Sequence, residues 1–550
     1  MNTGVSQMFD FVSGQFDFMF HCAQRFNETN RKTIGATAEL AKAGQIYWNG
    51  IFKYMNEFSE PYMIAQNAFS TLEGEKAMRT PPWETVTDYL ELLQFNLQVA
   101  EKGLTSSLLS MNNFHLAKMT EAFSAWLNTV FDLEGEDIEA FSTKLAQLMA
   151  TVVYAYPEAI RNIEPEYGFH FDNGGYEKVA ETDRFLLYQV LPWDSQKNAV
   201  KIREEGKPII IIPPYVLGAN ILSFLPGENK SYVHAYANHG IPTYIRIMKE
   251  IDSTAAVQVM TGEDDALDTR FFCEQVMARH QKAVTLNGFC QGGFISMANF
   301  LSGELDGLVD ALITCVAPLD GTRSKALVEY MNHLPPRFRD LGYAVKSLPN
   351  GNQVVDGKVM SWVYKLKSME REAPLFTFYR DLLMFDRPNG HKLKVSKTAA
   401  AINHWLLYDR KDLPEAITKM SFDSYTIPVD KEGTLPVKLF DRKLNFKRLQ
   451  EKGITLLICY GEQDDLVDKD TALAPLDFID AEVTPFPKGH GAMATSWSVP
   501  DSEYSLDSRF GDDCRGPVRF QLDLEQALDK ASGKSTKGKS SSKPKNKVKN

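Results

Sequence analysis

The feature that most constrains the fold of this chain is a series of short apolar runs that alternate with helical stretches from about residue 180 onward. The runs are rich in β-branched residues, and they cover residues 185–191, 209–212, 243–247, 284–287, 311–317, 454–460 and 482–486. Several are apolar throughout, as strands are when helices cover both faces of a sheet. The alternation therefore predicts an α/β fold with a mostly parallel sheet.

Residues before this region have a helical texture. The segment 80–84 combines a capping hydroxyl, two prolines and an acid, which is a helix start signal. Two apolar stripes with helical spacing follow, formed by Val86, Leu90, Leu93 and Leu97 and by Ile138, Phe141, Leu145, Leu148 and Val152. We expect such stripes to pack into a core, with a surface for a partner or a lipid-like body as the alternative.

These patterns predict a helical N-terminal domain at residues 1–175, an α/β domain at 176–528 and a tail at 529–550. Roughly 135 residues between Ala317 and Ile454 contain no comparable strand, so we expect a cap inserted at about residues 322–450. From Lys530 onward the tail has 8 lysines, no acid and no apolar periodicity. It is predicted to be disordered.

Charge and cysteine content exclude several classes of protein. Lys and Arg number 60 against 71 Asp and Glu, a net charge of -11, so we expect no specific nucleic-acid binding. The six cysteines form no C-x-x-C pair, which argues against a disulfide framework and a structural zinc site. There is no long apolar run and no basic region of a secretory signal at the start. We therefore expect no transmembrane span and a cytoplasmic location.

The segment Gly288-Phe289-Cys290-Gln291-Gly292-Gly293 follows one predicted strand and opens a predicted helix. It has the form G-x-C-x-G, the cysteine version of the nucleophile elbow of α/β-hydrolases. The turn is crowded, so small residues must flank the nucleophile. The backbone N–H of the next residue, Gln291, points to where an oxyanion would form. We predict that Cys290 is a nucleophile.

A nucleophilic thiol needs a base, and in this fold the order along the chain is nucleophile, acid, histidine. His490 lies between two glycines just after the last predicted strand, where the fold places its base. The other histidines after Cys290 fall in the predicted cap, where we expect structural or surface roles; they are His333, His391 and His404.

The acid should follow the preceding strand, which ends at Tyr460. Asp464 is our choice because it falls in the turn just past the strand end. Asp465 is the competitor, and Asp468 is better suited to cap the next helix. A second oxyanion donor would come from the loop after residues 209–212. There Pro213 and Pro214 have no N–H, which leaves the backbone N–H of Tyr215 or Val216.

A cysteine nucleophile favours acyl transfer from a thioester over ester hydrolysis. The acyl-enzyme is itself a thioester, so exchange with a substrate thioester is close to thermoneutral and the acyl group stays activated toward an alcohol. A long cap fits this chemistry, because excluding water protects a transferable acyl group.

Residues from about 208 to 496 resemble the polyhydroxyalkanoate synthases. The elbow matches their G-[FY]-C-x-G-G, residues 461–467 resemble their G-x-x-D-x-[IV]-V acid loop, and Gly489-His490 matches their G-H. Residues 212–229 resemble their strand-loop-helix entry, and residues 316–320 resemble the strand and L-D after their elbow. Two positions depart from the family: Asp465 stands where a histidine usually follows the acid, and Met248-Lys249-Glu250 stands where a tryptophan is usual.

The resemblance implies a Cys290–His490–Asp464 acyltransferase that polymerises 3-hydroxyacyl-CoA into a polyester, with no metal and no redox cofactor. It also implies association with the polymer granule surface, and it leaves a homodimer open. One alternative is an intracellular polyhydroxyalkanoate depolymerase or thioesterase on the same scaffold. Another is a granule-associated protein without catalytic activity, suggested by the helical N-terminal region and the basic tail.

Overall fold

A computed structural model describes residues 3–193, 200–325, 328, 339–365, 373–386, 395–511 and 514–531. The chain divides into two compact units. The first, here called the helical unit, comprises Met1–Glu164, Asn332–Ala344 and Lys358–Tyr408. The second, here called the sheet unit, comprises Pro165–Met331, Val345–Gly357 and Asp409–Asn550. Each unit is described by itself.

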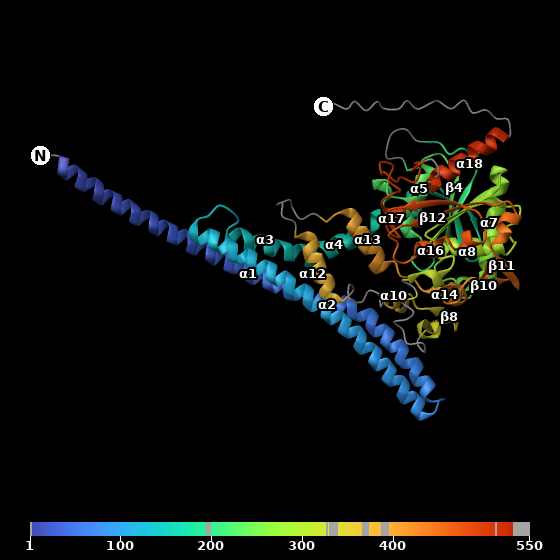
Figure 1. The fold of residues 1–550 in the computed structure, drawn as a ribbon, viewed down its shortest axis with the longest axis horizontal. Coiled ribbons are helices and arrows are strands. Elements are labelled where there is room, and N and C mark those ends of the chain that lie inside the picture. The colour runs from blue at the N-terminus through green and yellow to red at the C-terminus, as the bar shows by residue number, and fades with distance from the viewer. Residues whose placement is uncertain are drawn as a thin grey trace. The chain divides into compact units, whose positions relative to one another are not determined.

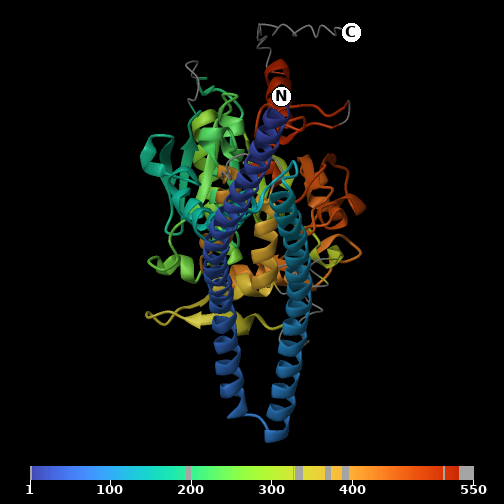
Figure 2. The same ribbon diagram turned by 90° about the vertical axis from the view of Figure 1, so that its left-hand side faces the viewer.

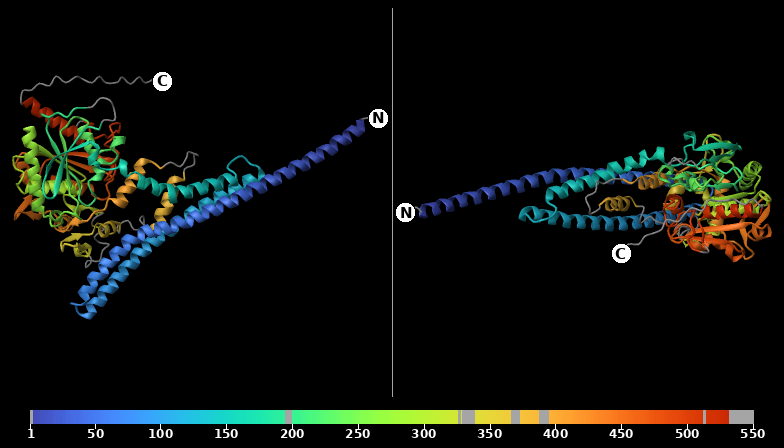
Figure 3. Two further views of the ribbon diagram at one scale, coloured as in Figure 1. Left: turned by 180° about the vertical axis from the view of Figure 1, so that it is seen from behind. Right: turned by 90° about the horizontal axis from the view of Figure 1, so that it is seen from above.

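The helical unit is built on a hairpin of two long helices, which Figure 2 shows joined by a short turn. The second of them starts at Pro82, as the start signal predicts. Shorter helices pack against this hairpin, and in Figure 3 α12 lies between its two long helices. The bounds are α1 Thr3–Ala77, α2 Pro82–Phe131, α3 Ile138–Ala150, α4 Tyr156–Asn162, α12 Pro374–Phe385 and α13 Lys397–Tyr408, with a π-helical turn at Thr151–Ala155.

The two predicted apolar stripes have different fates. Most of the second stripe is in the core of the helical unit, with Val152 fully buried. The first stripe, on α2, is 55–62 % exposed from Val86 to Leu97, so the expectation that it forms core is wrong. The buried side of this part of α2 is instead the one that carries Leu92 and Phe95. Spacing alone identifies an apolar face but does not show whether another element covers it.

The division into units differs from the predicted domain boundaries. Helix α12, from the segment expected to be a cap, contributes Phe378, Tyr379 and Leu382 to the main core of the helical unit. There they join side chains of α1 and α2, such as Tyr54 and Phe114. Burial of these large side chains holds residues 374–385 in the helical unit.

The sheet unit contains an eight-stranded sheet in the order β1-β2-β4-β3-β5-β6-β12-β13. The pairs β1–β2 and β2–β4 are antiparallel, and all other neighbours are parallel. The strands are β1 Tyr176–Glu181, β2 Phe185–Val190, β3 Ile209–Ile212, β4 Thr243–Met248, β5 Val284–Phe289, β6 Val309–Cys315, β12 Thr455–Gly461 and β13 Glu482–Phe486. Helices of the unit surround the sheet in Figure 1; they include α5 Tyr232–Ala237, α7 Gly262–His280, α8 Gln291–Leu301 and α18 Pro517–Ala531.

This architecture confirms the predicted fold class and all seven predicted strands. The eighth strand, β1, is absent from the prediction because it is mostly exposed and its residues YEKVAE are largely polar. In its described parts, the segment between β6 and β12 carries five further strands outside the main sheet, where the sequence indicates none comparable. They are β7 Val345–Ser347, β8 Gln353–Val355, β9 Leu413–Pro414, β10 Thr434–Leu439 and β11 Arg442–Asn445.

The register of the parallel strands brings several loops to one edge of the sheet. Ile212 at the end of β3 pairs with Gly288, and Phe289 at the end of β5 pairs with Cys315. On the next strand Cys459 also pairs with Cys315. The loops that follow β3, β5, β12 and β13 therefore meet at the carboxyl edge, where open α/β sheets place their sites.

Two further expectations concern membranes and the tail. Among the described residues, no helix combines the length and the apolarity that a membrane span requires. Most of the predicted disordered tail, residues 532–550, lies outside the described residues, as do His333 and His391.

We expect Gly292→Ala to destabilise the sheet unit, although alanine is the better helix former. A Cβ at this position would overlap the backbone carbonyl oxygen of Ile212. The free energy of unfolding should fall by about 3 kcal/mol or more in a urea titration followed by circular dichroism. Gly227→Ala is the matched control, because a Cβ there meets no atom within 4 Å, and it should be close to neutral. Equal stability of the two variants would contradict this account of the elbow.

Candidate active site

Cys290 occupies the turn between β5 and α8. Its φ of 53° and ψ of -125° lie in a region that non-glycine residues rarely adopt. A hydrogen bond from its backbone N–H to the Cys315 carbonyl oxygen, 2.8 Å long, and one from the Gly293 N–H to its own carbonyl oxygen, 2.9 Å long, hold the turn. This is the strained strand-to-helix geometry of a nucleophile elbow.

The three glycines of the elbow are there because backbone segments approach closely. A Cβ on Gly288 would overlap the backbone of Gly292 and Gly293, and one on Gly293 would press on the side chain of Ala317. Two of these glycines begin α8 although glycine is a poor helix former. The requirement for space therefore overrides local helix propensity at this site.

Asp464 and His490 meet at the ends of the neighbouring strands β12 and β13. His490 Nδ1–H donates to Asp464 Oδ2 over 2.8 Å, and the carboxylate side chain is fully buried. The backbone N–H groups of Leu466 and Val467 donate to Asp464 Oδ1, each over 2.9 Å. Asp464 is thus held at both oxygens and orients the imidazole so that Nε2 is available.

His490 lies beside the elbow. Its ring packs edge-to-face on Phe289, the residue before Cys290, with 6.1 Å between the ring centroids. Burial by itself would lower the pKa of His490, but interactions with Cys290 and Asp464 raise it well above its ordinary value. The imidazole of His490 therefore interacts electrostatically with the thiol of Cys290 as well as with the carboxylate of Asp464.

The competing acids have other surroundings. Asp465 is exposed, whereas Asp464 is buried against the imidazole. Asp468 is the N-cap residue of the short helix α16, Lys469–Ala472, and its Oδ2 accepts the backbone N–H of Lys325 over 2.6 Å. The structure brings the predicted acid Asp464 into hydrogen-bond contact with His490.

The predicted oxyanion loop gives an unexpected result. The backbone N–H groups of both Tyr215 and Val216 donate to the side-chain oxygen Oε1 of Gln291, each over 3.1 Å. The amide nitrogen Nε2 of Gln291 donates in turn to Ser421 Oγ over 2.7 Å. Ser421 lies on α14, Glu415–Thr426, in the segment between β6 and β12. The role of the Gln291 side chain and of Ser421 has no motif in the sequence to indicate it.

The oxyanion loop is anchored by a buried polar network. The Tyr215 hydroxyl donates to Asp265 and accepts a 2.8 Å hydrogen bond from Arg246. Arg246 also donates to Asp265 over 2.9 Å, and both charged side chains are within 1 % of complete burial. Asn299 adds a 2.6 Å bond to the same carboxylate. A charged residue inside the apolar run 243–247 is the sequence signal that could have pointed to this network.

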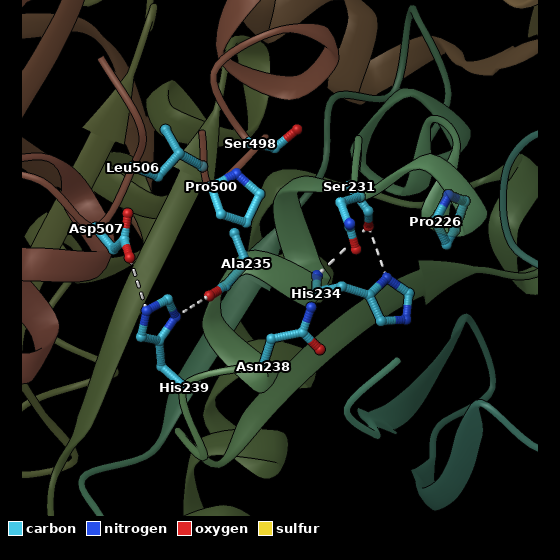
Figure 4. A pocket seen from close by; sticks show the side chains of 11 residues that line it. Pro226, Ser231, His234, Ala235, Asn238, His239, Ser498, Pro500, Leu506 and Asp507 are labelled. Atoms are coloured by element: carbon cyan, nitrogen blue, oxygen red, sulfur yellow. Dashed lines mark hydrogen bonds and ion pairs between the residues drawn. The ribbon is translucent and has the colours of Figure 1, made fainter. Parts of the chain in front are cut away.

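Other histidines lie away from the elbow or contact different groups. His404 Nδ1–H donates to the Ile160 carbonyl oxygen within the helical unit. His239 and Asp507, 2.8 Å apart, line a separate small pocket, drawn in Figure 4, that includes none of Cys290, Asp464 and His490. Within the described ranges, no group of three or more His, Cys, Asp or Glu side chains is arranged to hold a metal ion.

Comparisons with known proteins were made for the sequence and for the structure. The sequence matches no model of a known protein family and no curated protein. Solved structures similar to the chain include an esterase from Rhodococcus sp. ECU1013, with 13 % identity, 64 % of this chain and 98 % of that chain covered, and a TM-score of 0.32. A carboxylesterase structure from Nitrososphaera gargenis has 13 % identity, 66 % and 100 % coverage and a TM-score of 0.34. A thermophilic esterase from Thermogutta terrifontis has 12 % identity, 62 % and 98 % coverage and a TM-score of 0.29. The strand order and the elbow of the sheet unit are themselves those of an α/β-hydrolase fold.

Proposed function

We propose that this chain is an acyltransferase that polymerises 3-hydroxyacyl-CoA into a polyhydroxyalkanoate through a thioester on Cys290. The observation that carries the proposal is the strained cysteine at the elbow, beside an imidazole that a buried carboxylate orients. A sulfur nucleophile suits a thioester donor, and the resemblance of residues 208–496 to polyhydroxyalkanoate synthases names the substrate class. The thioester substrate supplies the acyl group, so the proposal needs no further cofactor.

In the first half-reaction His490 Nε2 takes the proton of the Cys290 thiol. The thiolate attacks the thioester carbon of the substrate, and backbone N–H donors stabilise the tetrahedral oxyanion. Collapse of this intermediate breaks the carbon–sulfur bond to CoA. The leaving thiolate takes the proton from His490, and the acyl group remains on Cys290.

In the second half-reaction the 3-hydroxyl group of another acyl unit is the acceptor. His490 takes its proton as the oxygen attacks the Cys290 thioester, and Asp464 stabilises the imidazolium that forms. The new ester lengthens the chain, and the Cys290 thiol is regenerated with the proton from His490. If water were the acceptor instead, the same residues would make a depolymerase or a thioesterase.

The proposal also assigns a partner to the helical unit. A growing polyester is apolar and forms a granule, and α2 exposes the apolar side chains Val86, Leu90, Leu93 and Leu97. Large exposed apolar faces are typical of contact sites for a partner or a lipid-like body. We expect this face of α2 to lie against the granule, with the protein in the cytoplasm.

The first prediction concerns the products. Incubation with 3-hydroxybutyryl-CoA should release CoA, leave an acyl group on Cys290 detectable by intact mass, and yield a polyester. Cys290→Ala should abolish all three, whereas Cys22→Ala, which removes an exposed thiol, should abolish none of them. Release of CoA with only free hydroxy acid would reject polymerisation in favour of hydrolysis. An unreactive Cys290 together with intact granule binding would favour a protein without catalytic activity.

The second prediction separates the two neighbouring acids. Asp464→Asn should lower the rate of CoA release by at least about 100-fold, because an amide no longer fixes the imidazole and balances its charge. Asp465→Asn should change the rate little, because that side chain is exposed and the buried Asp464 already accepts the hydrogen bond of the His490 imidazole. A steady-state assay of CoA release measures both variants. Similar losses in the two variants would contradict the assignment of Asp464.

The third prediction uses the raised pKa of His490. A histidine whose pKa is raised keeps its proton above pH 6.5, so we expect the imidazole of His490 to hold a positive charge beside the sulfur of Cys290 near neutral pH. Alkylation of Cys290 by iodoacetamide should therefore be fast at pH 7. In His490→Ala it should be roughly tenfold slower there and should recover as the pH rises.

The matched control for this pH profile is His239→Ala. A hydrogen bond to Asp507 also raises the pKa of His239, but this histidine lies in the separate pocket of Figure 4. The alkylation profile of His239→Ala should match that of the unchanged protein. If the alkylation profile of His490→Ala also matched that of the unchanged protein, His490 would not interact with the nucleophile.

A further inference from the structure

The side chain of Gln291 occupies a place that catalysis would require for a substrate oxygen. In the proposed mechanism the N–H of Tyr215 or Val216 completes the oxyanion hole that the Gln291 N–H begins. Both loop N–H groups instead donate to Gln291 Oε1 over 3.1 Å. Because two donors converge on it, this atom must be the oxygen of the amide and not its nitrogen. The amide oxygen therefore sits where an acyl oxygen would be bound.

The other end of the same amide is also satisfied. Its Nε2 donates to Ser421 Oγ over 2.7 Å, and both side chains are buried, with Gln291 3 % and Ser421 4 % exposed. A buried amide with partners at both ends is a stable arrangement. Ser421 thus holds the Gln291 side chain where its Oε1 accepts the hydrogen bonds of the two loop N–H groups.

The donors themselves are not free to turn away. Tyr215 is fixed through its hydroxyl to Asp265 and to Arg246, and that network is buried. Gln291 reaches the loop through three rotatable side-chain bonds. When an acyl oxygen competes for the same N–H groups, the element that yields is the glutamine side chain and not the loop.

We infer that the Gln291 side chain is a plug in the oxyanion hole, latched by Ser421, that the carbonyl oxygen of the acyl substrate displaces. The inference rests on the proposed role of Cys290 as nucleophile. It adds a residue that controls formation of the acyl-enzyme and that belongs to no part of the triad. Displacement exchanges one carbonyl acceptor for another at the loop, and the freed amide gives up its bond to Ser421.

Two reagents distinguish occupation of the oxyanion hole by the Gln291 side chain from the intrinsic reactivity of the Cys290 thiol. Acetylation of Cys290 by p-nitrophenyl acetate passes through a tetrahedral oxyanion, with p-nitrophenolate as the leaving group. Alkylation by iodoacetamide is a direct displacement of iodide and forms no oxyanion. The ratio of the two second-order rate constants, each measured on the full chain from the mass of the peptide that carries Cys290, reports on the oxyanion hole alone.

Two substitutions at position 291 should move this ratio in opposite directions. Gln291→Ala removes the plug and leaves the backbone donors, so the ratio should rise several-fold. Gln291→Glu places a charged acceptor on the same donors, where charge-assisted hydrogen bonds are about twice as strong, so the ratio should fall at least about tenfold. A ratio that falls in both variants would show that the side chain positions the loop and would overturn the inference.

A variant of the latch gives a second, independent readout. Ser421→Ala should raise the ratio, less than Gln291→Ala does, because the plug stays but loses its anchor. Thr426→Ala is the matched control: it is exposed on the same helix and should leave the ratio unchanged. If Gln291→Ala does not fold, this pair decides the question, and an unchanged ratio in Ser421→Ala overturns the inference.

The outcomes also distinguish this inference from the proposed function. If the variants respond as expected to p-nitrophenyl acetate but the protein does not react with 3-hydroxyacyl-CoA, the plug is supported and the proposed substrate is contradicted. If the protein polymerises 3-hydroxyacyl-CoA but the ratio of the rate constants is unchanged in the variants, the proposed function is supported and the plug is contradicted. A Cys290 that reacts with neither reagent overturns both.

Discussion

The backbone of Cys290 is the constraint on which the rest of the site depends. A cysteine in the left-handed region pays a conformational penalty of roughly 1–3 kcal/mol, and it persists only where the surroundings leave no alternative. Here the surroundings are backbone atoms and one small side chain. Gly292 leaves no room for a Cβ against the Ile212 carbonyl, and Gly293 leaves none against Ala317. Segments that follow two neighbouring strands thus pack closely on the turn, and this packing keeps the backbone of Cys290 in its strained conformation.

The loop that follows β3 is a second fixed element beside the elbow. The pair Arg246–Asp265 is almost completely buried, where an uncompensated charge would be very unfavourable, so its members need one another and their remaining partners. Tyr215 is one of those partners. The loop that carries the Val216 N–H is therefore tied to the interior of the sheet unit. The backbone N–H donors of this loop and the backbone of Cys290 are therefore both fixed. The conformational freedom that remains in the site belongs to side chains.

Sequence patterns locate most of this machinery but not its contacts. The runs at 209–212 and 284–287 reveal their strands because they are buried on both faces, whereas β1 escapes because its exposed, largely polar residues resemble a loop. Asp464 precedes Asp465 in a turn, and only the pairing of β12 with β13 determines which carboxylate reaches His490. For the same reason the apolar stripe from Val86 to Leu97 shows its period but not its exposure. The spacing of apolar residues describes a single helix or strand. The exposure of the stripe and the choice of the acid depend on contacts between two such elements.

The contact between Gln291 and Ser421 ties the segment between β6 and β12 to the elbow. Helix α14 is held against the sheet unit independently of the site: a Cβ on Gly321 would overlap Tyr425, so the two backbones lie close together there. In the inferred arrangement, Ser421 on α14 acts on the Gln291 side chain and is not itself one of Cys290, Asp464 and His490. Under the proposed mechanism, sequence changes in this segment would alter how readily an acyl-enzyme forms while Cys290, Asp464 and His490 stay the same. In an α/β-hydrolase fold, where function varies through the loops that follow the strands, this separates control of the oxyanion hole from the chemistry of the nucleophile.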